Sequence, residues 1–376
     1  MTLTSYKLGE LIEQSDDYNS DKLLTINDVR GISTAKDFIE TKANLDGVNV
    51  VSYKIVNKEE FAYVADTSRR GEKIALAYNT NEGRILTSSI YTVFFVKRKD
   101  LLLSDYLFMY FKRPEFDRFS RFNSWGSARE TFGWEDLCEI EIELPSLEVQ
   151  QKYVDIYNAM LSNQQSYERG LEDLKLVCDA YIEDLRRRIP CEAIGPYIEE
   201  RNEKNEGNEI TLFQGVNVDH VFTEPKRVAE DSENGSVVRT GQFAFNKVMK
   251  AHNTKLPIAL REGPDCVVSN SYQVFEVTNT KKLLSKYLLL WLNRDETQRY
   301  AGFISFGTTR DIFSFDDMKE ISIPLPDISI QQSIVDLFTC YQTRSDINEK
   351  LKAQIKDICP ILIKGSIEEG MKTKEA

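Results

Sequence analysis

A segment of fourteen residues occurs twice in this chain. LPSLEVQQKYVDIY begins at Leu144, LPDISIQQSIVDLF begins 181 residues later at Leu325, and six of the fourteen positions are identical. A period of about 180 residues is too long for a solenoid repeat and typical of a pair of domains, so the sequence predicts a tandem duplication. Other matching pairs follow in the same order: FAY (Phe61–Tyr63) with FAF (Phe243–Phe245), IYTVF (Ile90–Phe94) with SYQVF (Ser271–Phe275), LLSDYLFMYFKR (Leu102–Arg113) with LLSKYLLLWLNR (Leu283–Arg294), and WGSARETFGWEDL (Trp125–Leu137) with FGTTRDIFSFDDM (Phe306–Met318).

Each copy is expected to begin with strands and to end in a long helix. β-Branched and aromatic residues favour strands at Phe61–Val64 and Tyr91–Val96. A helix with an apolar face is expected at Ser104–Lys112. EIEIELP, which ends at Pro145, alternates charged and apolar residues as a half-buried strand does, and EISIPLP (Glu320–Pro326) repeats this pattern. The predicted fold class is α+β, with two duplicated α/β domains.

The segment Gln150–Arg188 contains no proline, and its apolar residues recur at alternating steps of four and three. This rhythm indicates a coiled-coil seam, and such a helix reaches roughly 58 Å at 1.5 Å per residue. The second copy repeats the rhythm from Ile334 to Leu362, and Pro360 is expected to kink or shorten that helix.

We expect the two long helices to pack antiparallel about a pseudo-twofold axis, with the core of an ordinary bundle as the alternative. Polar Gln164, Arg344 and Asn348 fall in the seam, where they can fix its register. The corner before each helix is expected to contact partners or the other copy. The expected boundaries are a first α/β domain over 1–149, a long central helix over 150–189, a second α/β domain over 190–330 and a long C-terminal helix over 331–376.

Catalytic and cofactor signatures are missing from the sequence. It contains no GxGxxG, GxxxxGK[ST], HExxH, GxSxG, EF-hand or [DN]PP[YF] pattern, which favours a binding protein over an enzyme. No run approaches the length of a membrane span, and no signal peptide is visible at the start. Six cysteines form no CxxC pair and only two histidines are present, so we expect free thiols in a reducing cytoplasm and no metal site.

The net charge of −12 argues against indiscriminate binding of nucleic acid. The charges are nevertheless segregated along the chain. Residues 61–130 contain 12 basic and 8 acidic residues, whereas residues 131–200 contain 6 basic and 16 acidic residues. A local basic face is therefore compatible with the acidic total.

Two pairs of segments combine glycine, polar side chains and cations. WGSAR (Trp125–Arg129) matches FGTTR (Phe306–Arg310), while TSRRGEK (Thr67–Lys73) and NKVMKAHNTK (Asn246–Lys255) follow FAY and FAF. Arginine reads guanine and asparagine reads adenine in a major groove, so a shared framework with different side chains suits two reading sites. Capped loops with paired arginines, or exposed loops that diverged without function, remain open alternatives. The residues expected to contact DNA are Arg69, Arg70, Lys73, Asn79, Trp125, Ser127, Arg129, Lys247, Lys250, His252, Asn253, Lys255, Thr308, Thr309 and Arg310.

The whole pattern resembles the specificity subunit of a type I restriction–modification system. Subunits of this family carry two target recognition domains, each followed by a helical spacer that opens on a proline–x4–glutamine motif. The matching segments here are PSLEVQQ (Pro145–Gln151) and PDISIQQ (Pro326–Gln332). The family usually shows Glu–Gln where this chain has Gln–Gln, a departure that affects the helix start rather than recognition.

The resemblance implies a non-catalytic subunit that reads double-stranded DNA with a bipartite site. Its antiparallel helices would set the gap between the two halves and dock two methyltransferase (modification) subunits, which bind S-adenosylmethionine and flip out adenine. Restriction subunits that use ATP and Mg²⁺ would join the complex, so no cofactor is expected in this chain. The alternative is a duplicated coiled-coil scaffold that binds only protein.

Overall fold

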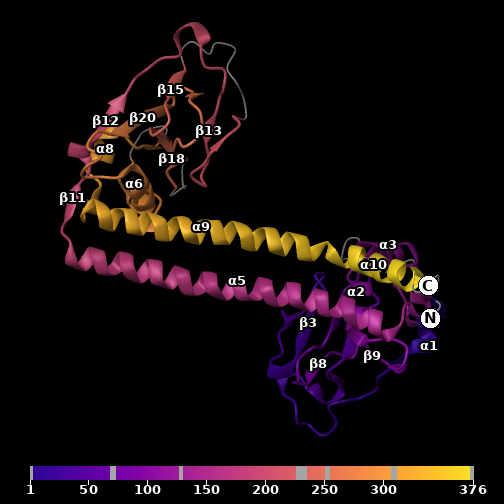
Figure 1. Ribbon diagram of the computed structural model, residues 1–376. Helices are drawn as coiled ribbons and strands as arrows, with labels where there is room; N and C mark the ends of the chain where they lie inside the picture. Colours follow the sequence, from indigo (N-terminus) through magenta and orange to yellow (C-terminus); the bar gives the residue numbers. More distant parts are fainter. Residues whose placement is uncertain are drawn as a thin grey trace. The chain divides into compact units, whose positions relative to one another are not determined.

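The computed structural model divides the chain into two compact units. Unit 1 consists of Met1–Glu168 together with Ile347–Ala376, and unit 2 consists of Arg169–Asp346. Both ends of the chain therefore belong to unit 1 (Figure 1). The structure describes residues 3–67, 73–126, 130–225, 235–249, 255–305 and 311–372.

A four-stranded antiparallel sheet in the order β2–β9–β6–β7 forms the centre of unit 1. Phe61 lies opposite both Phe94 and Tyr78, and its ring stacks on theirs with centroids 4.9 and 4.6 Å apart. The buried ring of Phe111 meets Phe61 edge-on, so α2 closes the aromatic face of the sheet. The elements involved are β2 (Ile12–Gln14), β6 (Glu60–Tyr63), β7 (Leu76–Tyr78), β9 (Thr92–Val96) and α2 (Ser104–Phe111).

Unit 2 repeats this sheet in the order β12–β20–β16–β18 with the same register. Phe243 lies opposite Phe275 and Leu260, at positions that follow their unit 1 counterparts by 181 or 182 residues. The duplication in the sequence is thus a duplication of structure. The elements are β12 (Ile198–Arg201), β16 (Phe243–Asn246), β18 (Ile258–Leu260), β20 (Tyr272–Val277) and the covering helix α6 (Ser285–Leu292).

Shorter elements complete each unit. Unit 1 adds β1 (Thr4–Lys7), α1 (Leu8–Leu11), β3 (Arg30–Ile32), β4 (Phe38–Glu40), β5 (Lys54–Val56), β8 (Ile85–Thr87), α3 (Pro114–Phe122), α4 (Trp134–Cys138) and β10 (Glu141–Leu144). Unit 2 adds β11 (Cys191–Ala193), β13 (Gly215–Val216), β14 (Phe222–Thr223), β15 (Ser236–Val238), β17 (Val248–Met249), β19 (Cys266–Val268), α7 (Asp295–Ile304), β21 (Asp311–Ile312), α8 (Phe315–Lys319) and β22 (Ser322–Pro324). The elements expected from the sequence, which are β6, β9, β10, β22 and α2, form within one or two residues of their predicted limits.

The first glutamine of each repeated corner fastens the long helix to its own unit. Gln150 is fully buried; its side chain accepts from the amide of Leu103 over 3.0 Å and donates to the carbonyl oxygens of Leu101 and Pro145 over 2.8 and 2.9 Å. Gln331 makes the same three bonds in unit 2, over 2.9, 2.8 and 2.9 Å. The duplicated proline–x4–glutamine spacing is therefore a structural clamp, and only the second glutamine of each pair is exposed.

Within unit 1, the start of α5 (Leu147–Arg188) packs antiparallel to the end of α9 (Ile328–Lys356) and to α10 (Ile358–Lys372). Two ion pairs show the direction: Lys152 contacts Glu369 over 2.8 Å and Glu168 contacts Lys352 over 2.6 Å. Gln164 donates to the side-chain oxygen of Asn348 over 3.2 Å, and both residues are buried. This confirms the expected polar pair in the seam.

Of two expected details of the long helices, the position of Arg344 is wrong and the shortening near Pro360 is confirmed. Arg344 is exposed, so its assignment to the seam is wrong. The second helix does not merely bend: it ends at Lys356 and α10 begins at Ile358, with Pro360 in the first turn, where a missing amide proton costs nothing. Within unit 2, Ile182 and Leu185 of α5 join Ile334 and Val335 of α9 in the core.

Candidate nucleic-acid interface

In unit 1, two of the segments selected from the sequence are anchored at the same place. The amide and the hydroxyl of Thr67 both donate to the carbonyl oxygen of Glu130, over 3.0 and 3.1 Å. Asp66 forms a bridge with Thr131, and Trp125 exchanges two backbone hydrogen bonds with Thr131 over 3.1 and 3.0 Å. TSRRGEK and WGSAR therefore share one base of paired backbone.

Unit 2 builds the same base as a short antiparallel ladder. β17 pairs with β21, Val248 opposite Ile312, at positions equivalent to the bridge in unit 1. The amide of Phe313 donates to the carbonyl oxygen of Lys247 over 2.9 Å, as the equivalent residues of unit 1 do over 2.8 Å. The two units therefore hold their paired segments by one backbone geometry, which side-chain changes leave intact.

A buried polar side chain fixes the residue just beyond the first segment in each unit. In unit 1, Asp117 of α3 accepts from the amide of Ile74 over 3.2 Å. In unit 2, Gln298 of α7 accepts from the amide of Leu256 over 2.6 Å. These anchors are equivalent by position, so the chain leaves each candidate reading segment at a fixed point.

The two anchors are completed by different partners. Gln298 donates its side-chain amide to the carbonyl oxygen of Leu292 over 2.6 Å. Asp117 is a carboxylate and cannot donate, and it is paired instead with buried Lys36. Burial lowers the pKa of Lys36, against the opposing pull of Asp117.

Exposed aromatic residues stand beside the shared base at equivalent positions. Phe122 of α3 is 80% exposed and Phe303 of α7 is 88% exposed, while Phe119 and Tyr300 are partly exposed one turn earlier. Trp125, three residues after the end of α3, is 68% exposed. Aromatic faces in such a place can stack on bases or pack against sugars. The sequence reasoning missed the two helical pairs, although aromatics at matching positions of a polar helix were a usable signal.

The structure describes five of the fifteen residues expected to contact DNA. Lys73 and Lys255 are exposed at equivalent positions, Trp125 is exposed, and Lys247 is half-buried at the base. Asn79 is fully buried, and its amide donates to the carbonyl oxygens of Val56 and Gly83 over 3.1 and 3.0 Å. That position holds a turn, so Asn79 is no longer a candidate contact. Arg69, Arg70, Ser127, Arg129, Lys250, His252, Asn253, Thr308, Thr309 and Arg310 lie outside the described residues.

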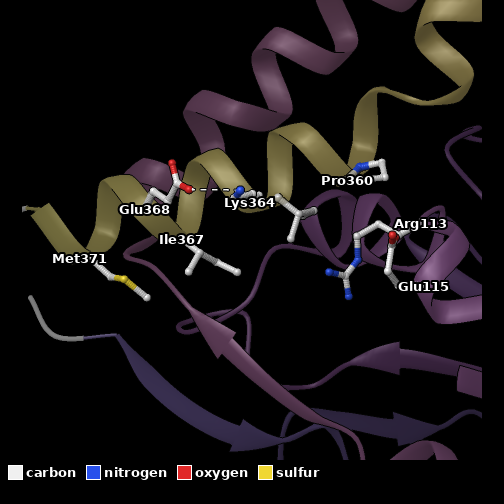
Figure 2. A pocket seen from close by; sticks show the side chains of 8 residues that line it. Arg113, Glu115, Pro360, Lys364, Ile367, Glu368 and Met371 are labelled. Atoms are coloured by element: carbon white, nitrogen blue, oxygen red, sulfur yellow. Dashed lines mark ion pairs between the residues drawn. The ribbon is translucent and has the colours of Figure 1, made fainter.

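A groove of about 560 Å³ runs along α10 in unit 1. Figure 2 shows Ile367 and Met371 of α10 on one side of it and Arg113 with Glu115 on the other. Unit 2 has a groove of about 320 Å³ at the equivalent arginine and glutamate, Arg294 and Glu296. The duplication therefore extends to surface features away from the shared base.

Neither a membrane helix nor a metal cluster was found in the described parts of the chain. No described helix is both long and apolar enough to cross a bilayer. The same residues contain no group of three or more histidine, cysteine or acidic side chains placed to hold a metal ion. All six cysteines are free.

Comparison with known proteins places the chain in a family. The type I restriction modification DNA specificity domain matches residues 4–173 and 239–357, well over half of the sequence. The chain belongs to this family of DNA specificity proteins. Specificity subunits of type I systems are non-catalytic, which agrees with the missing catalytic signatures.

Individual relatives agree with the family. The HindI specificity subunit of Haemophilus influenzae is 31% identical over 101 residues, which span 26% of this chain and only 22% of that protein. The S subunit of a type I restriction–modification system from M. genitalium has the same fold, with a TM-score of 0.60, 13% identity, and coverage of 97% of this chain and 99% of the other. The HsdS subunit from Thermoanaerobacter tengcongensis aligns over 97% and 96% at 18% identity with a TM-score of 0.46.

Proposed function

We propose that this chain recognises a bipartite DNA target, one half through each unit. The observation that carries the proposal is the duplicated base: in each unit, the two polar segments are held by the same backbone register beside an exposed aromatic pair. Phosphate contacts from the exposed lysines would position the duplex, and the segment side chains would read base edges. Because those side chains differ between the units, the two half-sites differ in sequence.

The partners in this proposal are two modification subunits and, in the complete system, restriction subunits that translocate DNA. Features that occur once in each unit support two copies of one partner: the paired grooves and the exposed Gln151–Asp155 and Gln332–Asp336 pairs, each hydrogen-bonded over 2.8 Å. S-adenosylmethionine, ATP and Mg²⁺ would be bound by the partner subunits, and the complex would act in the cytoplasm.

The decisive experiment alters the spacer. Seven residues inserted after Leu171 of α5, together with seven after Arg344 of α9, keep the seam in phase and lengthen the helices by about 10 Å. The gap tolerated between half-sites should grow by about three base pairs, because stacked bases rise 3.4 Å along a strand. The target is first defined by methylation profiling of the source genome.

The insertion has a clear control and a clear failure. An equal insertion in α5 alone should impair assembly without defining a new gap, because the two helices would no longer match. Methylation at the original gap by the doubly lengthened chain would refute the spacing role. Sequence-selective methylation by the modification subunits without this chain would refute the recognition role. A protein-only scaffold, the competing function, predicts no salt-dependent retention of DNA by the complex.

A further inference from the structure

Unit 1 contains a cation-lined pocket of about 450 Å³ beside its recognition base. Lys73, the last residue of the candidate reading segment Thr67–Lys73, lines one side. Lys112 and Arg118 come from α2's end and α3, and Lys356 comes from the last turn of α9. The pocket thus joins the reading segment to the helical spacer inside a single unit.

The charges in this pocket do not balance. Its lining has five cations against two carboxylates, those of Asp117 and Asp357. Lys36 is paired with Asp117, and Arg118 is paired with Glu115 over 3.2 Å. Lys73, Lys112 and Lys356 form no ion pair with any carboxylate in the described residues.

Buried Lys36 reports the positive field of the pocket. Its side chain is 4% exposed in the salt bridge, and its backbone has a φ of +69°, a conformation that lysine rarely adopts. Burial lowers its pKa, and Lys73 and Lys112 lower it further by repulsion. An anion entering the pocket would relieve this repulsion.

Unit 2 keeps part of this charge, because Lys255 and Arg299 stand at the positions equivalent to Lys73 and Arg118. Lys112 is replaced by Asn293, Asp117 by Gln298, and the Lys36–Asp117 pair has no counterpart at the equivalent anchor. Lys356 does have an equivalent, Lys175 of α5, which is exposed. The two units therefore differ at Lys112 and at the Lys36–Asp117 pair, whereas Lys73, Arg118 and Lys356 have basic counterparts in unit 2.

We propose that this pocket binds a backbone phosphate of the DNA on the spacer side of the half-site read by unit 1, so that the two half-sites are held with unequal strength. The inference rests on the proposed function and extends it. DNA is favoured over a small anion because Lys73 is the last residue of the candidate reading segment, so a duplex bound to that segment would lie at the edge of the pocket. Lysine ammonium groups suit a phosphodiester as point charges that require no fixed fork geometry.

Reciprocal substitutions test the proposal in the complex with modification subunits. Lys112→Asn installs the unit 2 residue in unit 1, and Asn293→Lys does the reverse, so each side chain is one that the framework already accepts. Lys112→Asn should make the slope of log K against log salt shallower by about 1 and weaken binding by up to about tenfold. The preference for target over random DNA should stay unchanged, since phosphate contacts carry no sequence information.

A matched pair of variants locates the contact. Lys356→Ala should reproduce the loss of salt dependence, whereas Lys175→Ala, its unit 2 equivalent, should leave the slope unchanged. A neutral methylphosphonate placed on the spacer side of the first half-site should weaken the wild-type complex and not the Lys112→Asn complex. The same substitution beside the second half-site should affect both complexes alike.

Three results would overturn the inference, and they are distinguishable. In the first test, inorganic phosphate or pyrophosphate is titrated into the complex. If the anion binds the wild-type complex but not the Lys112→Asn complex, and the salt slope for DNA is the same in both, the pocket binds a small anion. Unchanged slopes in a complex that still selects its target would refute the inference alone. A wild-type complex that cannot tell its target from random DNA would refute the proposed function together with this inference.

Discussion

Unit 1 and unit 2 solve one structural problem with different chemistry. Both must fix the backbone just beyond a reading segment, and both do so with a buried side chain at the same position of a short helix. Gln298 is neutral and satisfies two backbone groups by itself, whereas Asp117 brings a charge that requires Lys36. The difference shows that the duplicated frame tolerates exchange of anchors, provided that every buried polar group keeps a partner.

The largest expected effect comes from removing the counter-ion of Asp117. Lys36→Met leaves a buried carboxylate unpaired and should destabilise unit 1 by about 3–5 kcal/mol, as measured by denaturant unfolding with hydrogen exchange to locate the change. Lys36→Met with Asp117→Asn, which approaches the neutral anchor of unit 2, should recover most of the loss. Gln298→Glu should destabilise unit 2 in turn, because it introduces a buried charge where Gln298 now bonds only to backbone groups. A neutral outcome for Lys36→Met alone would contradict this account.

The repeated corner should respond equally in both units. Gln150→Ala and Gln331→Ala each remove three hydrogen bonds and leave an amide and carbonyl groups unsatisfied, at a cost of about 2–3 kcal/mol. Exposed Gln151→Ala is the control and should change the free energy of unfolding by less than about 0.5 kcal/mol. Chemical denaturation of the three variants measures this. Similar losses for Gln150→Ala and Gln151→Ala would deny the first glutamine its special role.

The exposed aromatics should matter for DNA and not for folding. Phe122→Ala and Phe303→Ala should each reduce the affinity of the complex for its target by about 1 kcal/mol while leaving the thermal midpoint nearly unchanged. Each loss should map to a different half-site in competition with half-site mutants. If both variants bind DNA normally but fail to retain a modification subunit, these residues belong to a protein interface.

The smallest expected effect is the change in stability of each unit as the pH falls. Glu60 of unit 1 is equivalent to Gln242 of unit 2, and burial raises the pKa of Glu60. Gln242 donates a hydrogen bond to Glu276 over 2.8 Å. The pKa of Glu276 is lowered, chiefly by its hydrogen bond from Arg201. A raised pKa means that the charged form of Glu60 disfavours folding, so protonation of Glu60 at lower pH increases the free energy of unfolding of unit 1. A lowered pKa means that the stabilising contribution of Glu276 is lost as the pH falls through it.

Hydrogen exchange measured from pH 7 down to pH 4 should therefore show opposite trends at these two positions. Glu60→Gln should stabilise unit 1 at neutral pH by an amount on the order of 0.5 kcal/mol and remove its acid response. Glu276→Gln should remove the response of unit 2 and lower its stability at neutral pH. Parallel trends in the two units would contradict the assignment of opposite pKa shifts.

Local patterns in the sequence were sufficient for the fold but not for the anchors. Alternation and heptad spacing placed β10 and α5, because each repeats one residue class at a fixed period, and β-branched and aromatic residues placed β6 and β9. Conserved spacing between the copies also located the corner. The hydrogen bonds of Gln150 to Leu101 and Leu103 could not be predicted, because these residues lie 49 and 47 positions away in the sequence.

The candidate site was predictable in outline only. The segments that begin at Thr67 and at Trp125 were selected because the duplication marks both, but the sequence did not indicate that they share one base of paired backbone. Asn79 was misassigned because an asparagine beside a polar loop looks the same whether it faces solvent or closes a turn. Lys36 was overlooked because only the tertiary fold brings it to Asp117, 81 residues further along the chain.

Unit 1 is built from two segments that are distant in the sequence, and this affects the order in which the two units can fold during synthesis. Its core takes in Leu362 and Ile363, and Tyr106 is hydrogen-bonded over 2.7 Å to Ser366, close to the last described residue. Unit 2 is contiguous and can fold as soon as residue 346 has left the ribosome. Unit 1 can complete its core only after α10 has been synthesised. A chain whose synthesis stops before α10 would therefore contain a closed unit 2 and an incomplete core in unit 1.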